Sequence, residues 1–518
     1  MPSRISKSTA SLRAPSRLAL IALAAGVAWA APANASEVVV VSATGTERVQ
    51  DPFVPAQAEI DLGPEPGSPR VRAVGAVSGP KAVGRALRRA KITGAKRAEY
   101  RRGYARARST LRKLRGARRT ELAYVVRSLE GIAVAGRLTA TRMPALFLQL
   151  RRNRSYWPSK TFPAAGDQLS FRGSELLFQY FPGRGLQLHP LSNFKKANLL
   201  HGACSGPGRA GKPVCGARPP GPKKGTPCRP GRLRRLLDEL SAIAVRRGNF
   251  VAWEYNFHFG GGSPPWMSGM AQSVAVVALG RASRTLKRPD YNVTAHNALG
   301  AFSTRSPVGV RTRGPMGGVH YLQYSFSRRL YIFNAFLQSL IGLYDYGRLA
   351  KDPAATKLFA DAEPEARREV PYSDVGDWSR YSFRGRESTA EYHELLREVL
   401  QGMGRRLGLT GPYCLRAIRY RGYQTDPPVL ALKLPEQTQR KRVMRVRFSV
   451  SKLSVVELRI FKGRKLAFKK LATFRRGSRA FSWRPKSAGD YRVRIAAKEL
   501  RTGRSLRGRA SGKLAVVP

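Results

Sequence analysis

Residues 332–346 read IFNAFLQSLIGLYDY, a run in which apolar side chains occupy nearly every side of a helix. A helix that is apolar all round is buried, so this stretch predicts the interior helix of a helical domain. Three further apolar stripes have helical spacing: Leu233, Leu236, Leu237, Leu240 and Ile243; Met270, Val274 and Val277; Leu395, Leu396, Val399 and Met403. Gly248 predicts the end of the first of these helices. Such helices, joined by loops with Trp, Tyr, His and Asn, suit an (α/α) toroid with its site at the loop end.

The chain changes character after Asp426-Pro427-Pro428, which indicates a domain boundary. Apolar and polar residues then alternate in several short stretches, for example at 444–450 and 491–495, as in half-buried strands. Trp483 together with the sequence AGDY at 488–491 looks like the Ig-like modules of bacterial exported proteins. The fold class we expect is therefore multidomain and mainly α, followed by a small all-β Ig-like sandwich at 433–518.

The N-terminus is typical of a secretory signal peptide. A basic lead at 4–17 precedes an apolar run at 18–30 that is too short to span a bilayer, and Ala33-Asn34-Ala35 is a small-x-small cleavage site. This pattern predicts a signal peptide at 1–35 and a mature chain that starts near Ser36. We expect a secreted, extracellular or cell-surface protein whose mature chain has no transmembrane span.

Two segments separate the predicted signal from the helical domain. Residues 36–79 are rich in Pro, Gly and small side chains without a sustained period, which predicts a linker or extended arm. We find no strand pattern between Ser36 and Leu169. Residues 80–168 predict a basic helical region, because 81–119 contain 16 basic residues and one acid, Glu99, in an Ala- and Leu-rich context.

The whole chain is strongly basic, with 94 Lys and Arg against 32 Asp and Glu and a formal net charge of +62. This charge favours a polyanionic partner such as an acidic polysaccharide, nucleic acid or an anionic cell surface. A base-composition bias of the genome would also produce an Arg- and Ala-rich chain. Charge alone therefore does not choose the partner.

The cysteines and histidines give no sign of a metal site. Four cysteines, Cys204, Cys215, Cys228 and Cys414, permit two disulfides in an exported chain, in any of three pairings. The first three fall in a Cys/Pro/Gly-rich loop at 203–232. Their wide spacing, with no histidine at ligand distance, does not fit zinc, and the sequence has no nucleotide-binding glycine motif. We expect neither metal nor cofactor.

Three stretches in order, at compatible spacing, resemble the C-terminal helical domain of D-glucuronyl C5-epimerases. They are PWMSGMAQ at 265–272, Tyr324 with NAFLQSLIGLYD at 334–345, and DWSRYSFR at 377–384 followed by Tyr392-His393. The resemblance covers about 170–410, and FPGRGLQ at 181–187 is similar to the start of that domain. It implies an epimerase-like α/α domain at 169–425. It also implies a uronic-acid-containing polysaccharide, such as a glycosaminoglycan, as the partner, with no nucleic acid.

Family members convert glucuronate to iduronate within heparan-type chains, so the resemblance implies catalytic roles for Tyr324, Tyr381 and Tyr392. C5 epimerisation removes a proton next to a carboxylate and returns one from the opposite face, which requires two acid/base groups and a partner for the carboxylate. Arg384 matches the arginine of the family motif and is the expected carboxylate partner. Further substrate-binding residues that we expect are Gln323, Asn334, His393 and Trp266.

A local pattern supports Tyr392 independently of the family. Ser388 and Glu391 fit a capping box, which places Tyr392 in the first turn of a helix and on its apolar side. The positive end of the helix dipole favours a phenolate there. Packing in the core is the alternative role for each tyrosine and for Trp266, while His393 and Asn334 could equally serve as helix caps or core hydrogen-bonding groups.

Two departures from the family pattern bear on activity. Gln323 stands where the family has glutamate, and Ser382 stands where it has aspartate. The extra β domain that precedes the helical domain in animal enzymes has no counterpart in the strand pattern. The sequence therefore predicts an exported uronosyl C5-epimerase, with a polysaccharide lyase or a non-catalytic cell-surface polysaccharide-binding protein as alternatives.

Overall fold

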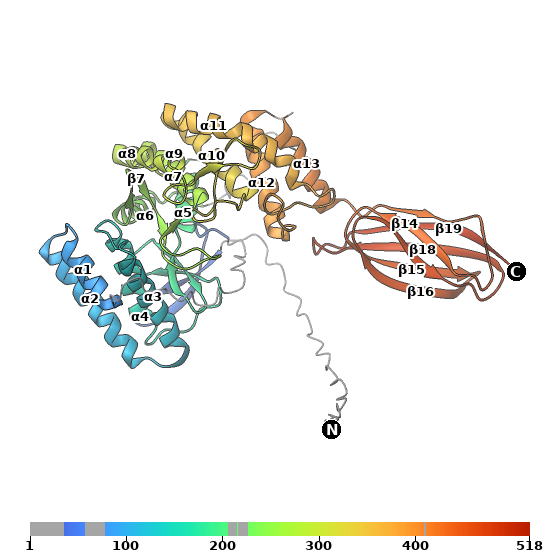
Figure 1. Cartoon of the computed structure of the whole chain (residues 1–518), viewed down its shortest axis with the longest axis horizontal. Coiled ribbons are helices and arrows are strands. Elements are labelled where there is room, and N and C mark those ends of the chain that lie inside the picture. Colours follow the sequence, from blue (N-terminus) through green and yellow to red (C-terminus); the bar gives the residue numbers. More distant parts are fainter. Residues whose placement is uncertain (1–35, 57–77, 206–214, 216–225, 409–410) are drawn as a thin grey trace, which may run out of the picture. The chain divides into compact units, whose positions relative to one another are not determined.

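The computed structural model describes residues 36–56, 78–205, 215, 226–408 and 411–518, and the predicted signal peptide at 1–35 lies outside them. Helices dominate the chain as far as α13 (Pro412–Thr425), and strands make up the rest (Figure 1). Two hydrophobic clusters underlie this division, one with side chains between Val39 and Tyr420 and the other between Met444 and Val516. The chain is therefore multidomain. Among the described residues, no helix has the length and apolar character to cross a membrane.

A five-stranded sheet opens the described chain. Its strands, in spatial order, are β2 (Thr46–Asp51), β1 (Ser36–Val41), β3 (Gln168–Phe171), β4 (Leu177–Phe181) and β5 (Gly185–Leu188). The prediction of a linker or arm at 36–79, without strands before Leu169, is therefore wrong for 36–51, while 57–77 lie outside the described residues. Val38, Val39 and Val41 are all buried, because β1 is covered on both faces. Such a strand lacks the alternation that marks a half-buried one.

Residues 80–168 hold four helices on one side of this sheet. They are α1 (Gly79–Arg89), α2 (Gly94–Lys113), α3 (Gly116–Val134) and α4 (Met143–Tyr156). Each buries a few apolar side chains, such as Val83 and Leu87 of α1, while most of its arginines stay exposed or half-buried. The basic side chains therefore face mainly solvent, and apolar contacts fix the helices in place.

A buried carboxylate joins these helices to the sheet. Glu121 of α3 accepts hydrogen bonds from the Tyr180 hydroxyl (2.8 Å) and from the backbone N–H groups of Gly183 (2.8 Å) and Gly185 (2.7 Å). Gly185 has a positive φ of 73°, and a Cβ there would lie 2.7 Å from Asn153 Oδ1. The turn between β4 and β5 thus depends on Glu121 for its donors and on glycine for its space.

The helical domain continues from residue 190 to 425. Its helices are α5 (Pro190–Cys204), α6 (Pro230–Ala242), α7 (Gly269–Thr285), α8 (Pro289–Ala298), α9 (Gly300–Ser303), α10 (Phe333–Ala350), α11 (Pro353–Glu369), η1 (Val370–Ser373), α12 (Ala390–Leu407) and α13 (Pro412–Thr425). Three two-stranded sheets lie between them: β6 (Val245–Arg247) with β7 (Phe250–Ala252), β8 (Glu254–Tyr255) with β9 (Trp266–Met267), and β10 (Arg311–Arg313) with β11 (Val319–Tyr321).

The predicted helix end at Gly248 is wrong. The helix stops at Ala242, and Gly248 forms the β6–β7 turn with a positive φ of 62°.

The interior helix predicted at 332–346 is confirmed as α10, and it packs closely against α7. Residues 269–280 of α7 are all buried. A Cβ on Gly342 would lie 2.6 Å from the Ser273 Cβ, and one on Gly280 would lie 2.7 Å from the Tyr346 ring. Small residues therefore set the approach of the two helices. That the helices close into an (α/α) toroid stays a prediction.

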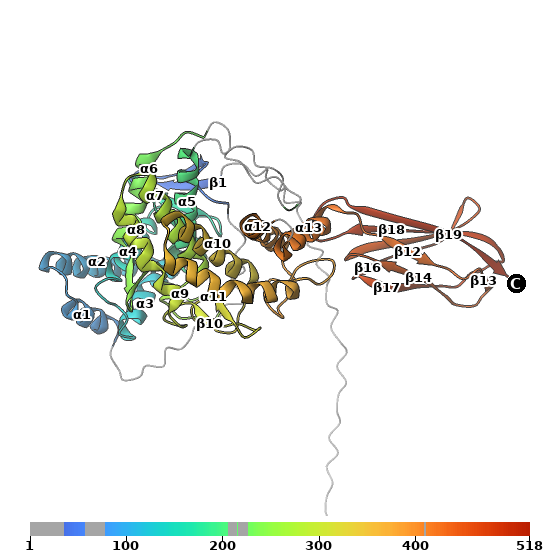
Figure 2. The same ribbon diagram turned by 90° about the horizontal axis from the view of Figure 1, so that it is seen from above.

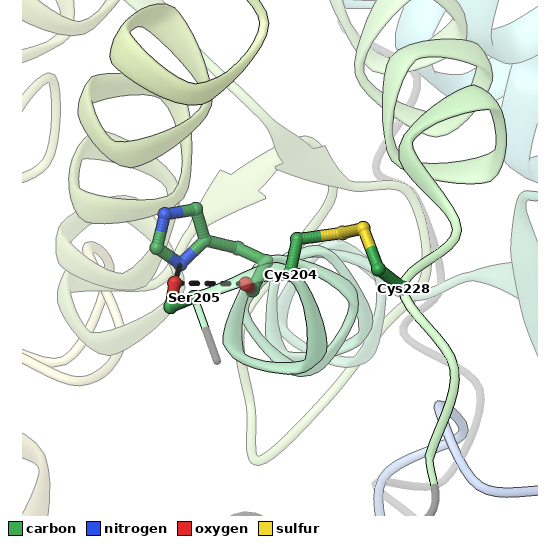
Figure 3. The surroundings of a disulfide bond; sticks show 4 residues. Cys204, Ser205 and Cys228 are labelled. Carbon is green, nitrogen blue, oxygen red and sulfur yellow. Dashed lines mark hydrogen bonds between the residues drawn. A yellow bond between two sulfur atoms is a disulfide. The ribbon is translucent and has the colours of Figure 1, made fainter. Parts of the chain in front are cut away.

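Two disulfides cross-link the helical domain, which settles the pairing that the sequence leaves open. Cys204 at the end of α5 is bonded to Cys228 before α6 (Figure 3), and Cys215 is bonded to Cys414 of α13. Cross-links of this kind limit the conformations of the unfolded chain. Of the Cys/Pro/Gly-rich loop predicted at 203–232, residues 206–214 and 216–225 lie outside the described residues.

The C-terminal part has two sheets that share one core, and its strands run lengthwise beside one another (Figure 2). The smaller sheet has the order β12 (Leu430–Lys433), β14 (Met444–Val450), β17 (Gly477–Trp483). The larger has the order β13 (Gln437–Gln439), β19 (Arg507–Val517), β18 (Gly489–Glu499), β15 (Ser454–Lys462), β16 (Lys465–Phe474). The predicted strands at 444–450 and 491–495 are confirmed. The Ig-like character of this part stays a prediction.

Replacing Glu121 by alanine is expected to destabilise the helical part by about 2–4 kcal/mol. Three donors would lose their acceptor, and a hydrogen bond to a charged group contributes about 1.5–3 kcal/mol to stability. Urea unfolding followed by circular dichroism measures the change. Glu99→Ala is the matched control, because Glu99 is exposed and pairs with Lys96 on the same helix, and it should cost less than about 0.5 kcal/mol. Equal effects of the two substitutions would contradict the role given to Glu121.

Candidate active site

One cavity lies where four helices begin. Its lining includes Leu191 and Ser192 from the first turn of α5, Met270 of α7, Asn334 of α10 and Tyr392 of α12. The other described lining residues are Ala56, Gln179, His189, Lys195, Tyr255, Phe257, Phe259, Trp266, Gln323, Tyr324, Tyr381 and Leu395. The first turn of a helix carries unpaired N–H groups and partial positive charge. The cavity is therefore an environment that favours a negative charge.

The three tyrosines named from the sequence meet in this cavity although they come from separate elements. Tyr324 follows β11, Tyr381 lies in the loop after η1, and Tyr392 lies in the first turn of α12. The rings of Tyr381 and Tyr392 have centroids 4.7 Å apart at 63°. The Tyr381 hydroxyl is hydrogen-bonded to the hydroxyls of both Tyr324 and Tyr392. Three phenols thus form one connected chain.

Burial and hydrogen bonding act in opposite directions on Tyr324. Desolvation raises the pKa of Tyr324, while hydrogen bonds from Tyr381 and Gln323 lower it by stabilising the phenolate. Desolvation also raises the pKa of Tyr381, and there the nearby Tyr324 and Tyr392 add to the rise. Of the two, Tyr324 therefore ionises more readily and Tyr381 remains the donor.

Gln323, which replaces the family glutamate, lines the cavity beside Tyr324. Its side chain hydrogen-bonds to the Tyr324 hydroxyl, and within the described residues its Oε1 is buried without a partner. A buried acceptor without a partner is costly unless something fills the role. A sugar hydroxyl donated to this oxygen would do so. Asn334 is buried at the start of α10 and also lines the cavity.

Aromatic rings form one wall of the cavity. Trp266 is stacked on Tyr255 with centroids 4.3 Å apart at 6°, and its edge meets Tyr324 at 5.5 Å. The Trp266 Nε1–H donates to the Phe257 carbonyl (2.8 Å). Trp266 is thus held within the wall, and its packing role is established by these contacts. Its stacking on a sugar stays a prediction.

The cap of α12 differs from the predicted capping box by one residue. Thr389 is the N-cap, and its Oγ1 accepts a hydrogen bond from the Tyr392 N–H (3.4 Å), so the box of Ser388 with Glu391 is wrong. Ser388 instead belongs to the preceding loop, where its backbone carbonyl accepts from Trp378 Nε1 (2.8 Å). Tyr392 remains in the first helical turn, as the sequence predicts, and it faces the cavity.

His393 lies beneath this loop and is absent from the cavity lining. Its Nδ1 is 2.8 Å from the Ser379 Oγ, its Nε2 is 3.1 Å from the Tyr420 carbonyl oxygen, and its ring stacks on Trp378 at 3.7 Å. Burial lowers the pKa of His393 to about 4, so the ring is neutral at pH 7. These contacts hold the loop that carries Tyr381.

The structure does not bring Arg384 into the cavity. Arg384 is exposed, has a positive φ of 56°, and places its guanidinium 5.6 Å from the Phe383 ring. Lys195 of α5 lines the cavity instead. Nothing in the sequence distinguishes Lys195 from 93 other basic residues. In contrast, Tyr255, Phe257 and Phe259 alternate with smaller or polar residues, a signal from which the aromatic wall could have been inferred.

The described residues include no cluster of His, Cys, Asp and Glu that could hold a metal ion. The cavity thus offers phenols, amides, one ammonium group and helix N-termini. Such groups can transfer protons, bind hydroxyls and stabilise an anion.

Comparison with known proteins identifies the part of the chain that carries the three tyrosines. Residues 247–406 match the family model for the C-terminus of D-glucuronyl C5-epimerase. The D-glucuronyl C5-epimerase of Caenorhabditis elegans is 29% identical over 133 residues, which are 23% of this chain and 22% of the worm enzyme. The chain thus matches about a fifth of that relative's length.

Two solved structures show limited similarity to parts of the chain. An endo-β-1,4-glucanase of Acetobacter xylinum is 14% identical, covers 45% of this chain and 72% of its own, and has a TM-score of 0.29. A CARDB domain from Pyrococcus furiosus is 12% identical, covers 17% of this chain and 90% of its own, and has a TM-score of 0.14. At these TM-scores neither similarity establishes a shared fold. Residues 247–406 of this chain, which carry Tyr324, Tyr381 and Tyr392, are thus similar to the C-terminal part of the D-glucuronyl C5-epimerases.

Proposed function

We propose that this chain is an exported epimerase that inverts C5 of uronic acid residues in an acidic polysaccharide. The observation that carries the proposal is the convergence of Tyr324, Tyr381 and Tyr392 in one cavity of the family segment. The helix N-termini around them suit an anionic substrate and an anionic intermediate. Export is supported by the signal-like N-terminus and by two disulfides, which suit an oxidising compartment.

In the proposed reaction, Tyr324 is the base and Tyr392 the acid for one direction. The Tyr324 phenolate takes the proton from C5, and the electron pair of the C–H bond delocalises into the uronate carboxylate. Tyr392 then donates its proton to C5 from the other face, so that no atom is gained or lost. The hydrogen bonds of Tyr381 to both partners allow it to re-equilibrate the proton between them after each turnover.

Gln323 has a supporting role in this scheme. Its hydrogen bond favours the Tyr324 phenolate, and its second polar atom is available to a sugar hydroxyl. Because an amide is not a base at ordinary pH, the proton transfer rests on the tyrosines. The rival assignment, a non-catalytic cell-surface polysaccharide-binding protein, is favoured by this same substitution and by the raised pKa values of Tyr324 and Tyr381.

Exchange of the C5 hydrogen in deuterated water tests the proposal. We expect the chain to incorporate deuterium at C5 of at least one polymer in a panel of glucuronate- and iduronate-containing glycosaminoglycans and other polyuronates. Tyr324→Phe and Tyr392→Phe should each reduce the rate by about 10²–10⁴-fold, as for loss of a general acid or base. Tyr372→Phe is the matched control, since Tyr372 is 52% exposed and lies outside the cavity lining.

The other outcomes identify the rivals. Salt-sensitive binding to the same polymers without any exchange would favour the binding protein. An unsaturated product that absorbs in the ultraviolet would show elimination of the C4 substituent, which is the lyase reaction. Undiminished exchange in Tyr324→Phe would remove Tyr324 from the mechanism.

The rate of exchange is expected to rise with pH through the neutral range. Desolvation holds the pKa of Tyr324 above that of free tyrosine, near 10, so only a small fraction is phenolate at neutral pH. Below the pKa this fraction grows about tenfold per pH unit, whereas Tyr381, with its pKa raised further, stays protonated as the donor. Rates at saturating substrate from about pH 7 to about pH 10 measure the effect. A plateau already reached below about pH 7 would indicate a different base.

A further inference from the structure

The cavity contains a single charged side chain among its described lining residues, and that side chain is cationic. The lining residues are apolar, aromatic or neutral and polar apart from Lys195 and His189. Burial, reinforced by the charge of Lys195, lowers the pKa of His189 to about 3, so this ring is neutral at pH 7. With Gln323 in place of a glutamate, no carboxylate of the lining offsets the ammonium group.

Two adjacent lysines of α5 have opposite surroundings. Lys196 is buried, and its ammonium lies 2.8 Å from the Glu175 Oε2 and 2.7 Å from the Glu175 carbonyl oxygen. Lys195 is half-buried, and the structure shows no ion pair or hydrogen bond of its ammonium with any described residue. The carboxylate that acts on it, Glu398 of α12, does so at longer range. Lys196 is therefore structural, whereas the charge of Lys195 has no direct partner.

The position of Lys195 on α5 fixes where it reaches into the cavity. Leu191, at the start of the helix, packs in one apolar cluster with Tyr324 and Tyr381. Lys195 follows Leu191 by four residues, just over one helical turn, which is about 6 Å along the axis. Both residues line the cavity, so α5, which precedes the family segment, presents the Lys195 side chain to the same cavity as the tyrosines.

We propose that Lys195 binds an acidic substituent of the polysaccharide, a carboxylate or a sulfate ester, and so selects anionic chains for this cavity. Desolvation lowers the pKa of Lys195, and Glu398 opposes this effect. A bound anion would restore the stability that desolvation takes from the ammonium. The expected effect of Lys195 on KM rests on the proposed function, whereas its expected effect on polymer binding does not.

Four variants test the proposal by titration calorimetry against a uronate polymer. Lys195→Met keeps the length of the side chain and removes the charge, and it should weaken binding about tenfold or more, while Lys195→Arg should retain most of the affinity. Glu398→Gln removes the anion that partly offsets Lys195, so it should bind as tightly as the parent chain or more tightly. Lys357→Met is the matched control, since Lys357 is exposed on α11 and should not alter binding.

Modified polymers identify the anion. If Lys195 binds a carboxylate, carboxyl reduction of the polymer should weaken its binding to the parent chain and leave its binding to Lys195→Met unchanged. If it reads a sulfate ester, desulfation should have that effect. Equal affinity of Lys195→Met and the parent chain for every polymer, with unchanged thermal unfolding, would overturn the proposal.

Activity separates this inference from the proposed function. Where C5 exchange is present, Lys195→Met should raise KM about tenfold with a smaller change in kcat, since the charge acts mainly on binding. If the parent chain shows no exchange but its binding still depends on Lys195, the epimerase assignment fails and the anion site stands. If exchange occurs with an unchanged KM in Lys195→Met, the anion site fails and the epimerase assignment stands.

Discussion

The constraint on which the site depends is that α5, α7, α10 and α12 all begin at one cavity. Each helix contributes a residue of its first turn to the lining. The N-terminus of a helix carries about half a positive charge, so four such ends create a field that favours an anion. The close contact of Gly342 with Ser273 allows α7 and α10 to start beside each other. A larger residue at that contact would displace Met270 and Asn334 together, and with them part of the cavity floor.

Within this field the tyrosines are subject to two opposing effects. Burial raises the pKa of Tyr324 and Tyr381, whereas donors around Tyr324 favour its phenolate. A glutamate at position 323 would add a negative charge next to that phenolate and next to an acidic substrate. Gln323 keeps a hydrogen-bonding group there without the charge. The cavity is thus better suited to binding an anion than it would be with glutamate, and in the proposed reaction the phenols transfer the proton.

The sequence could predict the features that leave a periodic or local pattern. The interior helix at 332–346 and the strand at 444–450 have such patterns, and both are found as expected. The strand at 36–41 was missed because its valines are buried on both faces, which removes the alternation. The predicted cap of α12 was one residue early because Ser388 and Thr389 are both good caps. Only the tertiary structure shows that the Ser388 backbone is engaged by Trp378.

Among the site residues, the tyrosines could be predicted because their motifs are specific, whereas Lys195 could not. Its neighbour Lys196 is also a lysine, but the Lys196 ammonium is buried in a salt bridge with Glu175, which lies 21 positions earlier in the chain. The sequence gives no sign of this difference. Arg384 shows the converse. It stands at the motif position, but the left-handed backbone and the contact with Phe383 keep it outside the cavity lining. Motif spacing fixes which residue is present, and the loop conformation decides where its side chain points.

The cavity lining comes from two parts of the chain, one for the proposed proton transfer and one for the proposed selection of the substrate. The tyrosines lie within the family segment at 247–406, while Gln179 and Lys195 come from β4 and α5, which precede it. The two parts are connected at the start of α5, where the Leu191 N–H donates to the Tyr255 hydroxyl (3.3 Å). The other end of α5 is cross-linked by the Cys204–Cys228 disulfide to the segment before α6, which also precedes the family segment. Because α5 is held at both ends, the reach of Lys195 relative to the tyrosines is fixed by the fold. The disulfide therefore helps to fix the position of α5 as well as contributing to stability.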